Sequence, residues 1–305
     1  MKGFSRSGSL VTAALFLAVS VTWGTTWMAM KIALTSFTPV LATGLRFLLA
    51  SPVLIGLARA GGHPLLFPAG KRLFQFGLAL FYFSLPFSLM IYAEETVSSG
   101  MASLLFAVMP VAVLSVSWLL TRQGVSRLQL FGTVIVMMAL GTIIIRESGT
   151  AEIQSWTGVV AILLAVGCHA VMYVLCKKHC SGISVLTSNA LPCLGAAFIL
   201  LILGLIRTPV HLVQVDPRAM AAVIYLGVVA GILGIMAYFQ LQKRVSPFRA
   251  SMVYFIFPLI ALSLDDMLNG QAISPLSALM VLPFLAGIFL VLRPTRETGA
   301  LSNEA

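Results

Sequence analysis

The chain has 305 residues, of which 59% are hydrophobic and only 9% are charged, and its mean hydropathy is +1.03. A soluble domain carries roughly 25% charged residues, so this composition excludes an ordinary soluble protein and indicates an all-α integral membrane protein. The formal net charge of +10 does not indicate nucleic-acid binding, because the basic residues are spread over separate loops and form no basic domain.

Ten apolar stretches are predicted to cross the membrane as helices. In chain order they cover residues 10–30, 39–58, 73–92, 98–120, 128–145, 156–176, 183–206, 219–240, 248–264 and 276–292. A bilayer core is spanned by about 20 helical residues, and most of these stretches match that length. Several are short or contain Pro and Gly, which is typical of helices that pack against neighbouring helices.

The distribution of basic residues predicts the orientation. With the N-terminus inside, 14 of the 19 Lys and Arg residues fall in inner segments, four fall in outer segments, and Arg46 lies within a span. Basic residues collect on the cytoplasmic side, so both termini are expected in the cytoplasm of a multi-pass inner-membrane protein. Lys2 and Arg6 before the first span also fit a signal peptide, but no small-residue cleavage site follows before a polar region.

Two halves of the chain repeat one another. The positions that recur 148 residues apart without a gap include Ser98 and Ser246, Ala102 and Ala250, Pro110 and Pro258, and Gln123 and Gln271. Each half holds five spans, an odd number, so the second half must enter the membrane with the opposite orientation. This inverted repeat predicts residues 1–148 as a first five-helix unit, 149–295 as a second, and 296–305 as a disordered cytoplasmic tail.

Several short motifs, in order and duplicated, resemble those of the drug/metabolite transporter superfamily, in particular its EamA-type ten-span members. They are Trp23-Gly24-Thr25 with Lys31, the stretch from Arg46 to Ala50, the stretch from Ser99 to Leu105 with Pro110, and Arg249-Ala250-Ser251 with Pro258. The resemblance implies a secondary transporter that exports small metabolites, such as amino acids or related compounds. The chain departs from the family at Gln123 and Gln271, where members often have Glu; these side chains cannot exchange protons.

Two ionisable side chains lie clearly inside predicted spans and are candidates for cargo handling. Arg46 could hold a carboxylate of the cargo with two hydrogen bonds, or its side chain could extend outward to the membrane surface. His169 could carry a proton, or it could be a neutral His bonded to a neighbouring helix. If transport is coupled to protons, the carrier is expected to be His169, the cargo itself, or an acid near an outer helix end such as Asp265 or Asp266.

Aromatic and uncharged polar residues complete the predicted substrate site. Trp23, Tyr82, Tyr173 and Tyr238 are expected to border a cavity, while Trp27 and Tyr92 near the outer boundary better fit the interfacial aromatic belt. Asn189 could contact substrate or bond between helices. Pro110 and Pro258 are expected to kink their helices and shape the pathway. Spans 1, 3, 4, 6, 8 and 9 should line the cavity, and spans 5 and 10 should be peripheral.

Other chemistries find little support in the sequence. Cys176 and Cys180 lack a second ligand pair, so neither a metal nor another cofactor is expected. The adjacent acids Glu94-Glu95 and Asp265-Asp266 do not face one another on a helix, and no phosphate-binding loop is present, so an enzyme is not expected. The expected partners are a small-molecule substrate and the lipid bilayer, with a homodimer left open. An importer or exchanger on the same scaffold, or a non-transporting membrane enzyme or sensor, remain the alternatives.

Overall fold

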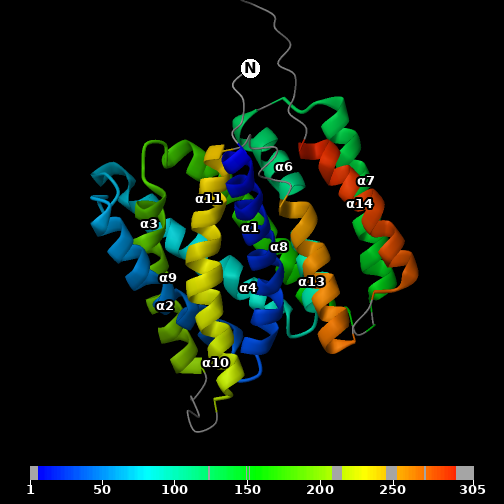
Figure 1. The fold of residues 1–305 in the computed structure, drawn as a ribbon, viewed down its shortest axis with the longest axis horizontal. Coiled ribbons are helices and arrows are strands. Elements are labelled where there is room, and N and C mark those ends of the chain that lie inside the picture. Colours follow the sequence, from blue (N-terminus) through cyan, green and yellow to red (C-terminus); the bar gives the residue numbers. More distant parts are fainter. Residues whose placement is uncertain are drawn as a thin grey trace, which may run out of the picture.

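The structure is a computed structural model that describes residues 6–122, 124–148, 150, 152–207, 215–244, 253–270 and 273–292. The described chain forms a bundle of long helices that run between two opposite ends of the molecule (Figure 1). Gln123, Gln271 and the ninth-span copy from Ser246 to Ser251 lie outside the described residues, so the predictions made for them are not addressed below.

Each half of the chain crosses the bundle five times. The first half contains α1 (Arg6–Ala33), α2 (Pro39–Ala60), a third crossing built from η1 (Ala69–Lys71), α3 (Arg72–Leu78), η2 (Ala79–Ser84) and α4 (Leu85–Ala93), a fourth from α5 (Ser99–Phe106) and α6 (Met109–Thr121), and α7 (Arg127–Glu147). The second half contains α8 (Trp156–His179), α9 (Val185–Arg207), an eighth crossing from α10 (Pro217–Ile224), η4 (Tyr225–Gly234) and α11 (Ile235–Arg244), then α13 (Val253–Asn269) and α14 (Pro275–Leu292).

Ten crossings therefore match the ten predicted spans, and the all-α membrane fold is confirmed. Nine of the described helical segments are long and apolar enough to cross a bilayer, and α13 adds a tenth crossing of 17 described residues. The ninth prediction ended at residue 264, but α13 continues through Asp265 to Asn269. Asp265 is therefore a helical residue and not part of a connecting loop.

Local sequence signals set where several helices begin. The side chains of Thr38 and Ser98 accept hydrogen bonds from the free backbone N–H groups at the starts of α2 and α5. Ser126 and Gln129 form a reciprocal capping box at the start of α7, in which each side chain bonds the backbone N–H of the other. Ser155 caps α8 in the same manner.

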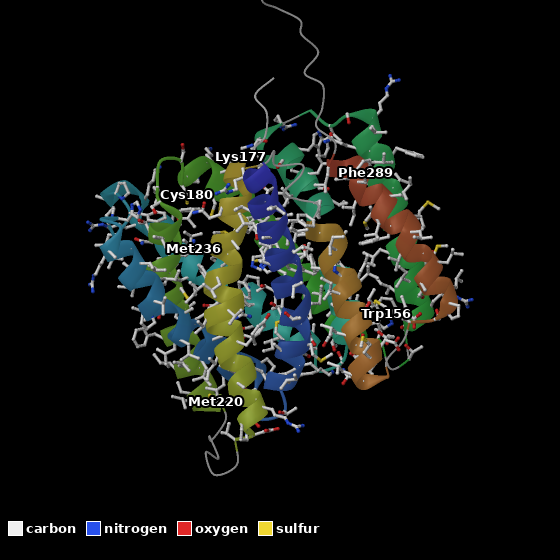
Figure 2. All side chains as sticks on the ribbon, viewed as in Figure 1. Trp156, Lys177, Cys180, Met220, Met236 and Phe289 are labelled. Carbon is white, nitrogen blue, oxygen red and sulfur yellow. The ribbon has the colours of Figure 1, made fainter. Side chains whose placement is uncertain are left out.

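The two halves have opposite directions in the bundle. In Figure 1, α1 begins at the end of the bundle that is nearest the N-terminus. Its counterpart α8 begins at the other end, where Trp156 is labelled in Figure 2, and reaches Lys177 at the end where α1 began. Equivalent helices therefore run antiparallel, as the odd number of spans per half requires.

Helices α7 and α14 pack side by side at one edge of the bundle (Figure 1). They approach closely because each contributes a glycine: a Cβ atom added at Gly132 would lie 2.7 Å from the carbonyl oxygen of Gly287, and one added at Gly287 would lie 2.8 Å from that of Gly132. Neither helix lines the central cavity described below, which agrees with the prediction that spans 5 and 10 are peripheral.

The third and eighth crossings each contain a π-helical stretch in the same place. In η2 and η4 the backbone winds with one extra residue per turn, and the residues of η2 fall within η4 when the 148-residue repeat offset is added. Such stretches frequently occur at functional sites. The fourth crossing is also interrupted, since α5 ends at Phe106 and α6 begins at Met109 beside Pro110, while α13 runs through Pro258 without a break.

Candidate central cavity

A cavity lies at the centre of the bundle, between the two halves. The volume of the cavity, counted as the space that the centre of a water molecule can occupy, is about 130 Å³. About 10–15 Å³ of such space holds one water, so there is room for roughly ten non-hydrogen atoms. The lining residues are Trp23, Thr26, Trp27, Arg46, Phe47, Ala50, Leu54, Tyr82, Phe83, Phe87, Met90, Phe106, His169, Tyr173, Val185, Leu186, Asn189, Cys193, Leu226, Gly227, Ala230, Gly231, Ile235, Met236, Tyr254 and Phe257.

Spans 2 and 7 also contribute to this lining, beyond the predicted spans 1, 3, 4, 6, 8 and 9; the sequence had already suggested Arg46 of span 2 and Asn189 of span 7 as substrate-binding residues. Helix α2 supplies Arg46 and Phe47, and α9 supplies Asn189 and Cys193. These two helices pack closely along one another, and Cys193 Sγ donates to the carbonyl of Phe47 at 3.6 Å. The pair therefore forms one wall of the cavity.

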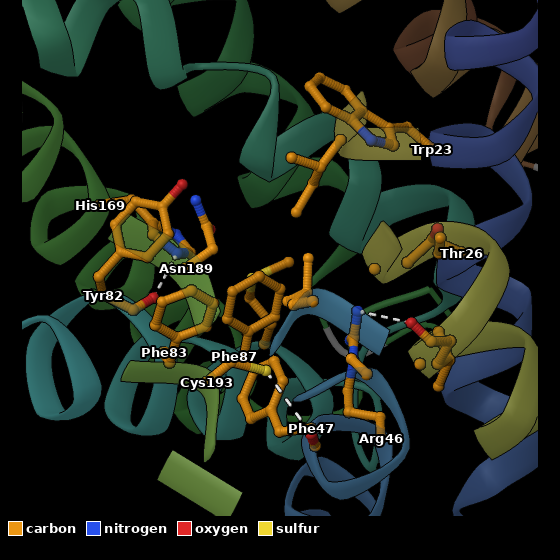
Figure 3. A pocket seen from close by; sticks show the side chains of 18 of the residues that line it. Trp23, Thr26, Arg46, Phe47, Tyr82, Phe83, Phe87, His169, Asn189 and Cys193 are labelled. Atoms are coloured by element: carbon orange, nitrogen blue, oxygen red, sulfur yellow. Dashed lines mark hydrogen bonds between the residues drawn. The ribbon is translucent and has the colours of Figure 1, made fainter. Parts of the chain in front are cut away.

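Six of the seven residues predicted to bind substrate line this cavity: Trp23, Arg46, Tyr82, His169, Tyr173 and Asn189 (Figure 3). Tyr238 does not line it. Its ring packs against Trp23 with the ring centroids 4.9 Å apart. The side-chain amide of Asn189 donates to the carbonyl of Val185 within its own helix at 2.7 Å, so the predicted bond to another helix is not the one it makes.

Arg46 introduces a positive charge into an aromatic surrounding. Its side chain is buried, and its guanidinium carbon lies 4.8 Å from the ring centroid of Phe87 and 5.6 Å from that of Phe47. Aromatic faces attract a cation electrostatically, which partly replaces lost hydration. Nη2 donates to the carbonyl of Leu226 at 3.3 Å, while Nε is buried without a hydrogen-bond partner. The guanidinium in the cavity wall is therefore only partly hydrogen-bonded.

His169 lies on the opposite wall inside an aromatic cage. The rings of Tyr82, Phe87, Phe106 and Tyr173 have centroids 5.2–6.0 Å from its own. Its Nε2 lies 3.2 Å from the carbonyl oxygen of Tyr82, and Nδ1 is buried without a partner. A carbonyl only accepts hydrogen bonds, so Nε2 must hold the proton and Nδ1 of the neutral ring offers a lone pair.

The two π-helical stretches accept these two side chains. Arg46 from the first half binds the carbonyl of Leu226 in η4, and His169 from the second half binds the carbonyl of Tyr82 in η2. Each π-helical stretch thus offers a carbonyl to a side chain of the other half, and the two bonds cross the seam between the halves (Figure 3). At this seam, a Cβ atom added to Gly227 would lie only 2.6 Å from the carbonyl oxygen of Arg46, so glycine is what lets η4 approach α2.

The prediction that Trp27 belongs to the interfacial belt is wrong. Its side chain is 3% exposed, lines the cavity and packs against Phe106 with ring centroids 5.5 Å apart. Several other aromatic residues line the cavity that were not predicted from the sequence, namely Phe47, Phe83, Phe87, Tyr254 and Phe257. Phenylalanine in an apolar helix gives no signal of its own, but Cys193 could have been found, because it is the repeat counterpart of Arg46 at the offset of 147.

Within the described ranges, no three His, Cys, Asp or Glu side chains come close enough to hold a metal ion together. Among the described lining residues, Arg46 is the one permanently charged side chain and there is no carboxylate. The cavity is thus an apolar, aromatic chamber with a cationic side chain on one wall and a few neutral polar groups.

Comparison with known proteins agrees with this two-half architecture. The family model described as the EamA-like transporter family matches residues 10–145 and again residues 156–293. The chain belongs to this family. A solved crystal structure shares the fold, with a TM-score of 0.62 over 94% of this chain and 96% of that one, at 18% identity.

Relatives of this EamA-like protein match over nearly their whole length. It is 47% identical to Protein PagO of Salmonella typhimurium over 278 residues, 91% of each chain. It is 43% identical to an uncharacterized transporter of Buchnera aphidicola over 93% of this chain and 95% of that one, and 26% identical to the uncharacterized inner membrane transporter YedA of Escherichia coli over 91% and 89%. The protein is therefore a multi-pass membrane transporter, with the bilayer and small molecules as its general partners.

Proposed function

We propose that this EamA-like protein resides in the inner membrane and exports small metabolites that combine a carboxylate with an apolar or aromatic body, amino acids and related compounds among them. Transport proceeds by alternating access, with both termini in the cytoplasm. The single observation that supports this cargo class most is the placement of Arg46, a partly unpaired guanidinium in the wall of an aromatic cavity.

The residues of the cavity wall indicate two properties of the cargo, a carboxylate and an apolar body. A guanidinium binds a carboxylate with charge-assisted hydrogen bonds, which are roughly twice as strong as neutral ones. Aromatic rings on the other walls suit an apolar body of about ten non-hydrogen atoms. An ammonium group would find no acid among the described lining residues, so it would have to rest against aromatic faces and neutral oxygens.

The inverted architecture supports alternating access. Two antiparallel halves can exchange two related arrangements that open to opposite sides, with the binding site at their seam. The contacts of Arg46 with η4 and of His169 with η2 lie at that seam, so cargo bound there touches both halves. The export direction itself comes from the family resemblance and needs flux measurements.

Binding to the purified full chain in lipid nanodiscs tests the cargo class. Phenylacetate, phenylpropionate and phenylalanine are compared with phenethylamine and phenylalanine amide, which lack the carboxylate. Ligands with a carboxylate are expected to bind, and Arg46→Gln is expected to weaken their binding about 10–100-fold, the equivalent of a charged hydrogen bond worth about 1.5–3 kcal/mol. Arg59→Gln, an exposed position on the same helix, is the matched control and should bind as the wild type does.

Equal binding of the amide and amine ligands, or unchanged carboxylate binding in Arg46→Gln, would contradict the proposed cargo class. Direction is measured separately in proteoliposomes with the best ligand. Faster transport from the cytoplasmic face to the external face than in the reverse direction supports export. Equal rates in the two directions that require cargo on both sides would show an exchanger.

A further inference from the structure

Three acidic side chains converge on the first turn of α5, at the end of the bundle where α4 ends. The hydroxyl of Ser98 donates to Glu152, the hydroxyl of Ser99 donates to Glu94 at 2.8 Å, and the backbone N–H of Gly100 donates to Asp265 at 2.8 Å. Three consecutive residues therefore each hold a carboxylate. The acids come from three separate segments: the α4–α5 turn, the α7–α8 connection and α13.

These acids are buried, and two of them are incompletely paired. Glu94 is 0% exposed, Glu152 is 3% exposed and Asp265 is 1% exposed. Asp265 is satisfied, because its second oxygen accepts from the side chain of Asn269 at 2.7 Å. In contrast, Oε1 of Glu94 and Oε1 of Glu152 are buried without any hydrogen-bond partner. A buried, unpaired carboxylate oxygen is costly when charged and much less so once a proton is bound.

The surrounding charges act on the two glutamates in both directions. Lys31, at the end of α1, donates to the backbone carbonyl of Glu94 and not to its carboxylate, although its charge favours ionisation. Asp265 opposes the ionisation of both glutamates, and Glu147 and Asp266 oppose that of Glu152. Glu147 itself is held by the backbone N–H and hydroxyl of Ser274 at 3.0 and 2.6 Å.

Burial is the dominant influence on both glutamates. It raises the pKa of Glu94 well above its ordinary value, against the opposing hydrogen bond from Ser99 and the charge of Lys31. It also raises the pKa of Glu152 to about 7, against the hydrogen bond from Ser98 and with reinforcement from the charge of Asp265. The three carboxylates bind separate donors on α5, and within the described ranges no three His, Cys, Asp or Glu side chains lie close enough to hold one metal ion together.

We propose that Glu94 and Glu152 form a proton-binding site that keeps this end of the transporter closed while protonated and lets it open when they ionise. The proposal rests on the alternating-access part of the proposed function and on the predicted orientation, in which this end faces the outside. It does not depend on the cargo class.

The contact between α5 and α13 is the element that the proton would control. The two helices meet so closely that a Cβ atom at Gly100 would lie 2.9 Å from Cα of Leu262, and the bond from Gly100 to Asp265 joins them. Ionised Glu94 and Glu152 would add two negative charges beside Asp265 in a dry site. Separation of α5 from α13 would hydrate all three acids, so loss of the protons favours the open arrangement.

The direction of the pH effect follows from linkage. Both glutamates bind protons more tightly in this closed arrangement than they would in water, so the closed arrangement is favoured at low pH and loses that advantage as pH rises through about 7. Acidic medium outside would thus supply the proton that closes the outer end. His169, which the sequence analysis placed first as proton carrier, lies in the central cavity and not at this helix contact.

Distance measurements between two spin labels test the proposal without any cargo. The four native cysteines are replaced by alanine, and labels are attached through Glu95→Cys and Met267→Cys, two exposed positions beside the cluster on the α4–α5 turn and on α13. In nanodiscs, a single short distance is expected at pH 5.5. At pH 8.5 a longer distance should hold a several-fold larger share of the molecules, because the pKa of each glutamate is raised in the closed arrangement.

Glu94→Gln combined with Glu152→Gln should keep the short distance at both pH values, because Gln resembles the protonated acid. Asp266→Asn removes an exposed acid at the same end and keeps both glutamates, so this matched control should retain the pH-dependent distance, with at most a small shift toward lower pH because one charge that opposes the ionisation of Glu152 is lost. A wild-type distance that does not change with pH overturns the proposal even if the glutamine variants fail to fold. A wild-type-like change of the distance with pH in the double variant would also overturn the proposal. So would a pH-dependent distance that is abolished by His169→Gln and not by the glutamine substitutions at Glu94 and Glu152.

Discussion

His169 is the residue whose role the structure narrows most. Its ring donates through Nε2 to the carbonyl of Tyr82 in η2, and four aromatic rings surround it. Its structural contribution therefore depends on a donor at that position. Proton transfer by His169 remains a separate prediction, which the pH arm of the spin-label experiment addresses.

The donor requirement predicts different outcomes for two substitutions at position 169. His169→Gln keeps an N–H that can reach the Tyr82 carbonyl and should unfold close to the wild-type temperature. His169→Leu removes the donor and leaves a buried carbonyl unpaired, at a cost of about 1–3 kcal/mol. Thermal unfolding in detergent compares the two variants, and equal stability of both would show that the bond to Tyr82 contributes little.

At the proposed cargo site, the two halves of the repeat have different residues at the position of Arg46. Its counterpart at the offset of 147 is Cys193, and the two lie in contacting helices on the same wall. The first half thus supplies a positively charged guanidinium at this position, and the second half supplies a small, uncharged thiol. An asymmetric ligand can therefore be held in one orientation, although the helices around it are related by pseudo-symmetry.

At the scale of elements, the paired π-helical stretches are the main departure from regular helices. In η2, the hydroxyl of Ser84 donates to the carbonyl of Ala79, five residues earlier, at 2.7 Å. This bond satisfies a carbonyl inside the π turn and helps to hold the stretch in its wide form. The same crossing contains Ser88, one turn further on, whose hydroxyl is buried without a partner.

These two serines provide a matched test of the π turn. Ser84→Ala should lower the free energy of unfolding by about 0.5–1.5 kcal/mol, because it deletes a buried side-chain hydrogen bond. Ser88→Ala removes a hydroxyl that has no partner and should be neutral or slightly stabilising. Thermal unfolding of both variants in the same detergent measures the difference, and a larger loss in Ser88→Ala would contradict this account of η2.

The sequence predicted the positions of the helices well, but not the π turns inside them or the faces on which their side chains lie. Long apolar windows and the charge bias are enough to locate ten crossings, because a bilayer imposes both the length and the composition of a span. A π turn shifts the hydrogen bonds by one residue without changing composition, so η2 and η4 had no detectable signal. Of the seven residues proposed for the site, Tyr238 packs against Trp23 and does not line the cavity, since depth in a span does not specify which face a side chain occupies.

The acids at the start of α5 also show what the sequence could not predict, namely which side chains meet. Glu94 and Glu95 do not face one another, as their adjacent positions predicted: Glu94 is buried and Glu95 is exposed. The sequence gives no sign of the second contact. It could not reveal that Glu152, 58 residues further on, joins Glu94 at the start of α5, because that meeting depends on how the α7–α8 connection packs against the α4–α5 turn.

For the whole molecule, orientation decides what the acidic cluster can sense. The cluster lies where α1 ends, since Lys31 bonds the carbonyl of Glu94, and so at the opposite end of the bundle from the start of α1. If α1 begins on the cytoplasmic side, the cluster is exposed to the external pH. If the orientation were reversed, Glu94 and Glu152 would face the well-buffered cytoplasm, and a proton-controlled outer end would have no physical basis. Topology is thus a premise of the proposed cycle.

Reporter fusions in intact cells test this premise directly. A reporter that works only in the cytoplasm should be active when fused after residue 305, because ten crossings return the chain to the side on which it began. The same reporter fused after residue 150, beyond five crossings, should be inactive, while one that works only outside the inner membrane should be active there. The paired positions serve as controls for each other, since an expression defect would silence both reporters at a site. The opposite pattern at both positions would preserve the inverted repeat but place the acidic cluster in the cytoplasm, whereas identical sidedness at both would contradict the odd number of spans per half.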